Sequence, residues 1–113
     1  MADDERNAMV TDWIAATNAH DTEAYLSFFT DDAVLDDPSV GSRFEGRERV
    51  ADYYEKYFIG YNTTTRIVRV APEGDHVHLD VHFIGDFPGG QTDGVFDITF
   101  TGKKISFIRA DLT

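Results

Sequence analysis

The spacing of apolar residues along this 113-residue chain changes at Gly60 from a helical pattern to a strand pattern. This change limits the possible folds more than any other feature. Before Gly60, apolar residues recur at spacings of three and four, which is typical of amphipathic helices. After Gly60, apolar and polar residues alternate between turn signals, which is typical of half-buried strands. The patterns predict helices at 3–20, 21–30 and 46–59, a short strand at 34–37, and further strands at 62–71, 76–84, 92–101 and 104–112.

Helices followed by antiparallel strands indicate an α+β fold. We expect three N-terminal helices packed in the concave face of a strongly curved, mainly antiparallel sheet, because the sheet and the helices must both bury an apolar face. A twisted sheet wrapped around helices leaves a conical pocket at its open end. The chain is long enough for one hydrophobic core and too short for two, so 1–113 is expected to be a single domain.

Aromatic residues make up 13% of the chain, with nine Phe, five Tyr and one Trp, which predicts a deep core or an aromatic-walled cavity. The chain has no cysteine, which excludes disulfides, thiolate zinc sites and cysteine nucleophiles. The first residues, MADDER, contain no apolar leader, and no long apolar run follows them. We therefore expect a soluble cytoplasmic protein that does not interact with a membrane.

The net charge of −11, from 10 basic and 21 acidic residues, disfavours nucleic acids and anionic membrane surfaces as partners. Aspartate outnumbers glutamate, and only three residues are lysine. Such a surface suits a high-salt cytoplasm, in which ions screen the repulsion between like charges. An ordinary acidic protein is an equally good interpretation, so both remain open.

Two carboxylates, Asp36 and Asp37, lie at the end of the predicted short strand. Side chains alternate between the two faces of a strand, so Asp37 faces the interior if Leu35 does, and Asp36 faces outward. Pro38 cannot donate a ladder hydrogen bond and ends the strand. Burying an unpaired carboxylate costs several kcal/mol, which indicates a partner or a function for Asp37. The alternative is that Asp37 only caps the turn that Pro38 opens.

Five segments of the chain together form a familiar pattern: WIAATNAHD at 13–21, FTDDAV at 29–34, DDP at 36–38, FEGR at 44–47 and FTGKKI at 100–105. With these segments the chain resembles the nuclear transport factor 2-like superfamily, specifically its ketosteroid isomerase and SnoaL-like polyketide cyclase branch. The resemblance covers nearly the whole chain and implies a cone-shaped α+β barrel. It implies less about activity, because this fold hosts isomerases, dehydratases, cyclases, epoxide hydrolases and plain binding domains.

In this resemblance, Asp37 matches the carboxylate that abstracts a proton next to the steroid carbonyl. Trp13 stands where the isomerases have an oxyanion-hole tyrosine, and Tyr54 matches a tyrosine that supports it. The second oxyanion donor falls near Phe96 or Asp97, and strand alternation puts Phe96 inside and Asp97 outside unless a bulge intervenes. The resemblance thus implies a general base without the usual oxyanion hole, and no cofactor. The expected catalytic residues are Asp37, Tyr54 and Trp13, and the expected pocket walls are Trp13, Phe29, Tyr54, Phe83, Phe96 and Ile108.

The segment HVHLDVH places His78, Asp80 and His82 on one face of the predicted strand 76–84. Imidazole and carboxylate groups suit a divalent metal. Neighbouring residues on the same face of a strand lie about 6.6 Å apart, because a strand rises ~3.3 Å per residue. Two of these side chains can therefore bind one ion, whereas all three can do so only if the strand bends. This face is also the outer face of the sheet, which the resemblance implies as a homodimer surface. We expect a homodimer through the outer sheet face, with a metal site at these three residues as the alternative.

Three functions remain open. In the first, Asp37 is the general base of a cofactor-independent isomerase or lyase, of cyclase or dehydratase type, that acts on a small apolar carbonyl-type substrate. In the second, the pocket binds a small apolar or aromatic molecule without chemistry. In the third, the protein is a dimeric interaction domain whose own aromatic side chains fill the cavity.

Overall fold

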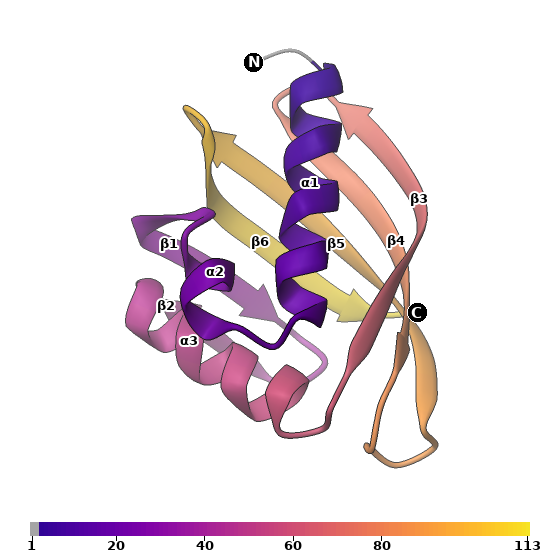
Figure 1. Ribbon diagram of the computed structural model, residues 1–113. Helices are drawn as coiled ribbons and strands as arrows, with labels where there is room; N and C mark the ends of the chain where they lie inside the picture. Colours follow the sequence, from indigo (N-terminus) through magenta and orange to yellow (C-terminus); the bar gives the residue numbers. More distant parts are fainter. Residues whose placement is uncertain (1–2) are drawn as a thin grey trace.

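One curved sheet of six strands carries all the helical segments on one of its faces (Figure 1). The computed structural model describes residues 3–113. The helices are α1 (Asp3–Asn18), α2 (Thr22–Leu26) and α3 (Arg47–Tyr54), and α3 continues as a π-helical segment over Glu55–Ile59. The strands are β1 (Phe29–Asp37), β2 (Ser42–Glu45), β3 (Thr64–Glu73), β4 (His76–Ile84), β5 (Gln91–Thr101) and β6 (Lys104–Leu112). The predicted α+β fold is confirmed.

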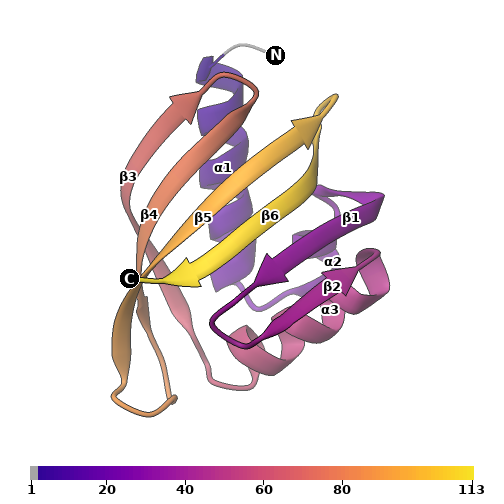
Figure 2. The same ribbon diagram turned by 180° about the vertical axis from the view of Figure 1, so that it is seen from behind.

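The strands follow the order β2-β1-β6-β5-β4-β3 across the sheet (Figure 2). β1 and β6 are parallel and all other neighbours are antiparallel, so the sheet is mainly antiparallel, as predicted. Parallel pairing brings the ends of β1 and β6 to the same edge, with Leu35 opposite Ile108 and Asp36 opposite Arg109. Asp37, the last residue of β1, is therefore held at this edge beside the end of the chain.

The second helix is shorter than the sequence predicts and the strand after it is longer. α2 ends at Leu26, whereas we expected it to continue to Thr30. The segment from Phe29 onward joins β1 because it pairs with Ile105 of β6, whose backbone N–H also donates to the Phe28 carbonyl at 2.7 Å. Pairing with a strand more than seventy positions away overrides the local helical pattern.

The strand β2 was not predicted at all. It pairs back onto β1 across the turn that Pro38 opens, with Asp37 opposite Ser42. Backbone hydrogen bonds from Val40 to the Asp37 carbonyl at 3.2 Å and from Gly41 to the Pro38 carbonyl at 3.1 Å close this turn. Gly41 has a φ of 72°, a conformation that favours glycine. The central stretch is thus a hairpin rather than a strand followed by a loop.

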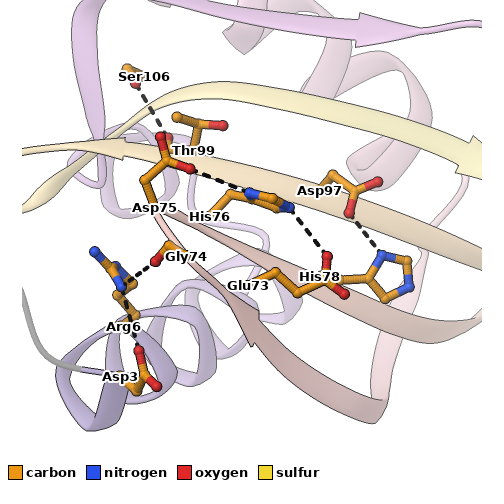
Figure 3. Close-up of polar contacts among 10 residues, drawn as sticks. All are labelled: Asp3, Arg6, Glu73, Gly74, Asp75, His76, His78, Asp97, Thr99 and Ser106. Atoms are coloured by element: carbon orange, nitrogen blue, oxygen red, sulfur yellow. Dashed lines mark hydrogen bonds and ion pairs between the residues drawn. The ribbon is translucent and has the colours of Figure 1, made fainter.

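The helix α1 lies across the concave face and buries the stripe that its periodicity predicts, with Val10, Trp13, Ile14 and Thr17 inside. Three acidic residues begin it, where the helix dipole favours negative charge. Near its start, the Arg6 guanidinium donates to the Gly74 carbonyl at 2.8 Å, which fixes α1 to the β3–β4 turn (Figure 3). Within residues 3–113, no helix combines the length and apolar character needed to span a membrane.

Aromatic rings form the centre of the core. The Trp13 ring lies 5.3 Å from Phe96 and 5.8 Å from Tyr25, and Tyr25 stacks on Tyr54 with 3.9 Å between ring centroids. All four side chains are almost fully buried. The high aromatic content therefore builds, in the first place, a packed core between the helices and the sheet.

Candidate functional site

A cavity of about 260 Å³ lies at the edge where β1 and β6 end. Its lining comes from the end of β1 and the turn after it, from α3 and the π-helical segment, from β4 and β5 with the loop between them, and from the last residues of β6. Seven of the lining residues are aromatic, namely Tyr53, Tyr57, Phe58, Tyr61, Phe83, Phe87 and Phe96. The cavity is thus aromatic-walled.

Asp37 lines this cavity and is 5% exposed. Within residues 3–113, it is the one acidic or basic residue that is buried. Its burial follows from strand parity, since Ala33, Leu35 and Asp37 of β1 are buried while Asp36 is only partly buried. Asp36 instead forms an ion pair with Arg109, with 3.8 Å between Asp36 Oδ2 and the guanidinium. The predicted orientation of the two carboxylates is confirmed.

Three donors hold the Asp37 carboxylate in place. Oδ1 accepts from the Ser39 backbone N–H at 3.0 Å and from the Ser39 hydroxyl at 2.5 Å, and Oδ2 accepts from the Tyr53 hydroxyl at 2.8 Å. An ionised carboxylate has about four acceptor positions, so about one, on Oδ2, is left for a ligand. Asp37 is therefore neither exposed to bulk water nor occupied only by its own turn.

Tyr53 is the residue on α3 that reaches Asp37. Its ring packs between Phe44 at 5.1 Å and Tyr57 at 5.3 Å, which fixes the direction of the hydroxyl. Burial raises the pKa of Tyr53 well above its ordinary value, and the negative charge of Asp37 and the hydrogen bond to it raise that pKa further. Tyr53 is therefore protonated at neutral pH and donates to the carboxylate.

Two of the six wall residues expected from the sequence, Phe83 and Phe96, line the cavity. The other four, Trp13, Phe29, Tyr54 and Ile108, are packed in the core and are not part of its lining. The Phe83 and Phe96 rings meet edge to face at 5.8 Å, and Phe96 in turn packs on Trp13. Phe96 thus separates the cavity from the deeper aromatic core.

Tyr54 and Trp13, which the resemblance implied as catalytic residues, are not brought together with Asp37. The Tyr54 hydroxyl donates to the Thr17 carbonyl at 2.7 Å, and burial together with the negative charge of Asp21 raises the pKa of Tyr54 to about 12. Trp13 Nε1 is buried and has no hydrogen-bond partner within residues 3–113. Neither group lines the cavity, so neither supplies a donor to it.

The site residues expected from the sequence did not include Tyr53, Ser39 or the outer ring of the cavity, formed by Tyr57, Tyr61 and Phe87. Tyr53 and Tyr57 stand four residues apart on a helical face, and Asp37-Pro38-Ser39 is a turn in which an aspartate accepts from the residue two positions later. These signals were present in the sequence. They identify a helix face and a turn, but they do not reveal that the two meet.

The histidines of β4 lie on the outer face of the sheet, away from the cavity. His78 Nδ1 is 2.7 Å from Asp97 of β5 (Figure 3), and His78 Nε2 is 2.9 Å from Asp80. The hydrogen bond to Asp97 raises the pKa of His78 above its ordinary value of 6.5, against the lowering effect of burial. Phe96 is buried and Asp97 points outward, as strand alternation predicted.

The metal alternative at His78, Asp80 and His82 is not supported by this arrangement. His82 has separate partners, with Nδ1 2.6 Å from Asp93 and Nε2 3.2 Å from Gln91. Within residues 3–113, no group of three histidine, aspartate or glutamate side chains is arranged to hold a metal ion. His78 and Asp80 contact each other, but His82 contacts Asp93 and Gln91 instead, so the three residues do not converge. The homodimer expected through this face stays a prediction.

Comparisons with known proteins find the same fold in solved structures. Among solved structures, the chain is similar to a candidate polyketide cyclase from Sinorhizobium meliloti, with 19% identity, a TM-score of 0.84, and coverage of 91% of this chain and 93% of that one. It is also similar to a protein with a ketosteroid isomerase-like fold from Catenulispora acidiphila in complex with trimethylamine, with 21% identity, a TM-score of 0.81, and coverage of 90% and 82%.

A third similar structure is a nuclear transport factor 2-like protein of unknown function from Cytophaga hutchinsonii, with 17% identity, a TM-score of 0.78, and coverage of 93% of this chain and 87% of that one. These likenesses show a shared fold. No curated protein matches the chain. The family model of the SnoaL-like domain matches residues 10–110, which is most of the sequence. The chain therefore belongs to the SnoaL-like domain family.

Proposed function

We propose that the cavity is the active site of a cofactor-independent isomerase or lyase in which Asp37 is the general base. The observation that carries this proposal is the buried Asp37 carboxylate on the wall of an aromatic cavity, held by Ser39 and Tyr53. A base that is fixed by its neighbours needs no reorientation when a substrate arrives. Asp37 keeps about one acceptor position on Oδ2, which is where a proton would be received.

The reaction begins with a C–H bond next to a substrate carbonyl. That bond breaks, the proton passes to Asp37, and the electron pair moves onto the carbonyl oxygen to give an enolate. If a C=C bond lies beyond the acidic carbon, the enolate is a dienolate, and Asp37 returns the proton to its far carbon, which is isomerisation. If the neighbouring carbon carries a leaving group, the enolate re-forms the carbonyl and a C=C bond while that group departs with its bonding pair and takes the proton from Asp37, which is elimination. Proton transfer by a positioned side chain contributes typically about 10²–10⁴ in rate.

Negative charge on the enolate oxygen requires a donor. Tyr57 and Tyr61 line the cavity, and their hydroxyls have no hydrogen-bond partner among the described residues. Either hydroxyl is available to donate to a substrate oxygen. These two hydroxyls differ from the groups at the positions that the isomerase resemblance matched to the oxyanion-hole network, which are Trp13 and Tyr54.

The volume and walls of the cavity limit the substrate. At about 260 Å³ the cavity is slightly smaller than the range of about 300–1,000 Å³ usual for ligand sites. Aromatic rings supply seven of the fifteen described lining residues, and the two charged ones are Asp37 and Asp111. These features favour a compact substrate with one or two rings and few polar groups.

The test is hydrogen exchange at carbon. Purified protein is incubated in deuterium oxide with a panel of small carbonyl compounds that includes cyclohexenone and phenylacetone, and deuterium incorporation next to the carbonyl is followed by NMR. Wild type should accelerate exchange of at least one compound, and Asp37→Asn should reduce that acceleration by about 10² or more. Asp36→Asn is the matched control, because it removes a neighbouring carboxylate from the opposite face of the same strand, and it should exchange like wild type. Equal rates in Asp37→Asn and wild type would contradict the proposal.

Binding without chemistry is a second candidate, and one observation favours it. The Tyr54 hydroxyl donates to Thr17 and Trp13 Nε1 is buried outside the cavity lining, so the two groups that the resemblance placed near the oxyanion hole do not serve the cavity. Loss of one such donor commonly costs about 10²–10³ in rate. If wild type binds members of the panel but exchanges none of them, this second function is the better description.

A further inference from the structure

The Asp37 carboxylate has hydrogen-bond donors but no counter-ion. Its partners are the Ser39 backbone N–H, the Ser39 hydroxyl and the Tyr53 hydroxyl, all of them neutral. Asp37 forms no ion pair with another residue of 3–113, whereas its neighbour Asp36 pairs with Arg109. Buried charges in proteins are usually paired, because removing an ion from water is costly. The side of Asp37 that protein does not cover opens onto the cavity.

The cavity supplies no positive side chain of its own. None of the described residues that line it is a lysine, an arginine or a histidine. Lys56 comes nearest to this role, with its ammonium 5.2 Å from the centroid of the Tyr57 ring, but Lys56 is exposed and is not part of the lining. A ligand with a carboxylate or phosphate group would therefore face the Asp37 charge without a compensating cation. The charges around the cavity therefore favour a cationic ligand over an anionic one.

The walls favour a cation as well. An aromatic ring carries negative charge over its face, and a cation within about 6 Å of the ring centroid is attracted to it, more strongly when water is excluded. Tyrosines 53, 57 and 61 and four phenylalanines surround the space next to Asp37. The contact between Lys56 and Tyr57 shows this attraction on the solvent side of one of these rings.

The charge of the whole chain acts in the same direction. With a net charge of −11, the protein attracts small cations from solution and repels small anions. This long-range field raises the rate at which a cation arrives, while Asp37 and the rings determine how strongly it is held.

We propose that the ligand of this cavity is an organic cation, an amine or quaternary ammonium compound of small size, and that Asp37 is its counter-ion. This inference rests on the proposed function only in that both require the cavity to bind a ligand. It adds the charge of the ligand, which the proposed general-base role leaves open.

The test compares two ligands of the same shape that differ in charge. Trimethylanilinium and tert-butylbenzene are isosteric, and only the first is positively charged. Their affinities for wild-type protein are measured at low ionic strength by ligand-observed NMR titration. The cation should bind about tenfold or more tightly than the neutral isostere, since a desolvated cation gains from both the rings and the carboxylate. Added salt should weaken binding of the cation and leave that of tert-butylbenzene unchanged.

Variants identify the counter-ion. Asp37→Asn should remove the preference for the cation while tert-butylbenzene still binds, which also shows that the cavity of the variant is intact. Asp36→Asn removes the same charge from the chain on the opposite strand face and should retain the preference.

Three results would overturn the inference, and they separate it from the proposed function. If wild type binds both ligands equally, the cavity is a binding site but does not select a cation, and the proposed charge of the ligand is wrong. If Asp37→Asn still prefers the cation, Asp37 is not the counter-ion. If neither ligand binds, this inference fails, whereas the proposed function is decided separately by the hydrogen-exchange test with carbonyl compounds. The wild-type comparison needs no variant, so it holds even if Asp37→Asn does not fold.

Discussion

The Tyr53 hydroxyl donates a hydrogen bond to Asp37 Oδ2 at 2.8 Å, and this one contact joins α3 to the end of β1. It connects two parts of the fold that the sequence separates by sixteen positions. It also determines what the carboxylate can do, because it fixes Oδ2 on the side where the aromatic cavity lies.

Tyr53→Phe should destabilise the protein. The substitution keeps the ring and its packing but removes the donor, which leaves a buried carboxylate with only its two bonds from Ser39. Hydrogen bonds to charged groups contribute about 1.5–3 kcal/mol, and we expect a loss of unfolding free energy near the lower end of that range. Urea denaturation followed by tryptophan fluorescence measures it.

Tyr57→Phe is the matched control for this prediction. Tyr57 lines the same cavity on the same helical face, but its hydroxyl has no hydrogen-bond partner among the described residues. Its loss should change the unfolding free energy by less than about 0.5 kcal/mol. Equal losses in the two variants would mean that the Tyr53–Asp37 contact adds no stability.

Much of the fold follows from local patterns in the sequence. The alternation along β1 is enough to predict that Asp37 faces inward and Asp36 outward, and the alternation along β5 does the same for Phe96 and Asp97. These predictions succeeded because the face of a side chain on a strand depends on parity alone. The strand β2 and the first half of β1 could not be predicted in this way, because they exist through pairing with distant strands.

The candidate site was less predictable than the fold. Tyr53 and Tyr54 are adjacent on α3 and point about 100° apart, since a helix has about 3.6 residues per turn. Which of them contacts Asp37 depends on the rotation of α3 about its own axis relative to the sheet. No local sequence pattern specifies this rotation. In the structure Tyr53 contacts Asp37, and Tyr54 donates instead to Thr17 at the end of α1. The catalytic role of Asp37 itself stays a prediction.

Gly94→Ala should disturb one wall of the cavity. Gly94 is buried in β5, and an added Cβ would lie 2.5 Å from the edge of the Phe83 ring and 3.0 Å from the Asp111 carbonyl oxygen. The ring has to move, and because Phe83 packs edge to face on Phe58 and Phe96, the wall moves with it. Overpacking of this kind costs typically about 1–3 kcal/mol, and we expect weaker ligand binding together with lower stability.

A second substitution tests whether the Phe83 ring is the cause. Phe83→Leu in the Gly94→Ala background shortens the side chain that the new methyl group meets, and it should recover part of the lost stability in urea denaturation. A double variant that is less stable than Gly94→Ala would place the strain elsewhere, for example at the Asp111 carbonyl oxygen.

His78 makes stability depend on pH. Its ring lies between Asp97 at 2.7 Å and Asp80 at 2.9 Å, and Asp80 also accepts from Arg69 at 2.9 Å. Because the pKa of His78 is raised above 6.5 in the folded protein, protonation stabilises the fold. This stabilisation is fully present below the pKa of the unfolded chain and is lost as the pH rises through the folded pKa.

We therefore expect the contribution of His78 to the melting temperature to fall as the pH is raised from about 5 to about 8, the range in which a histidine titrates. His78→Gln should remove this contribution, and Asp97→Asn should reduce it, because the hydrogen bond to Asp97 is the largest cause of the raised pKa. Lys103→Gln changes one exposed charge at the β5–β6 turn and should keep the wild-type profile. Thermal melts of the four proteins across this range check the prediction. A His78→Gln profile that is parallel to that of wild type would show that the His78 cluster does not couple protonation to folding.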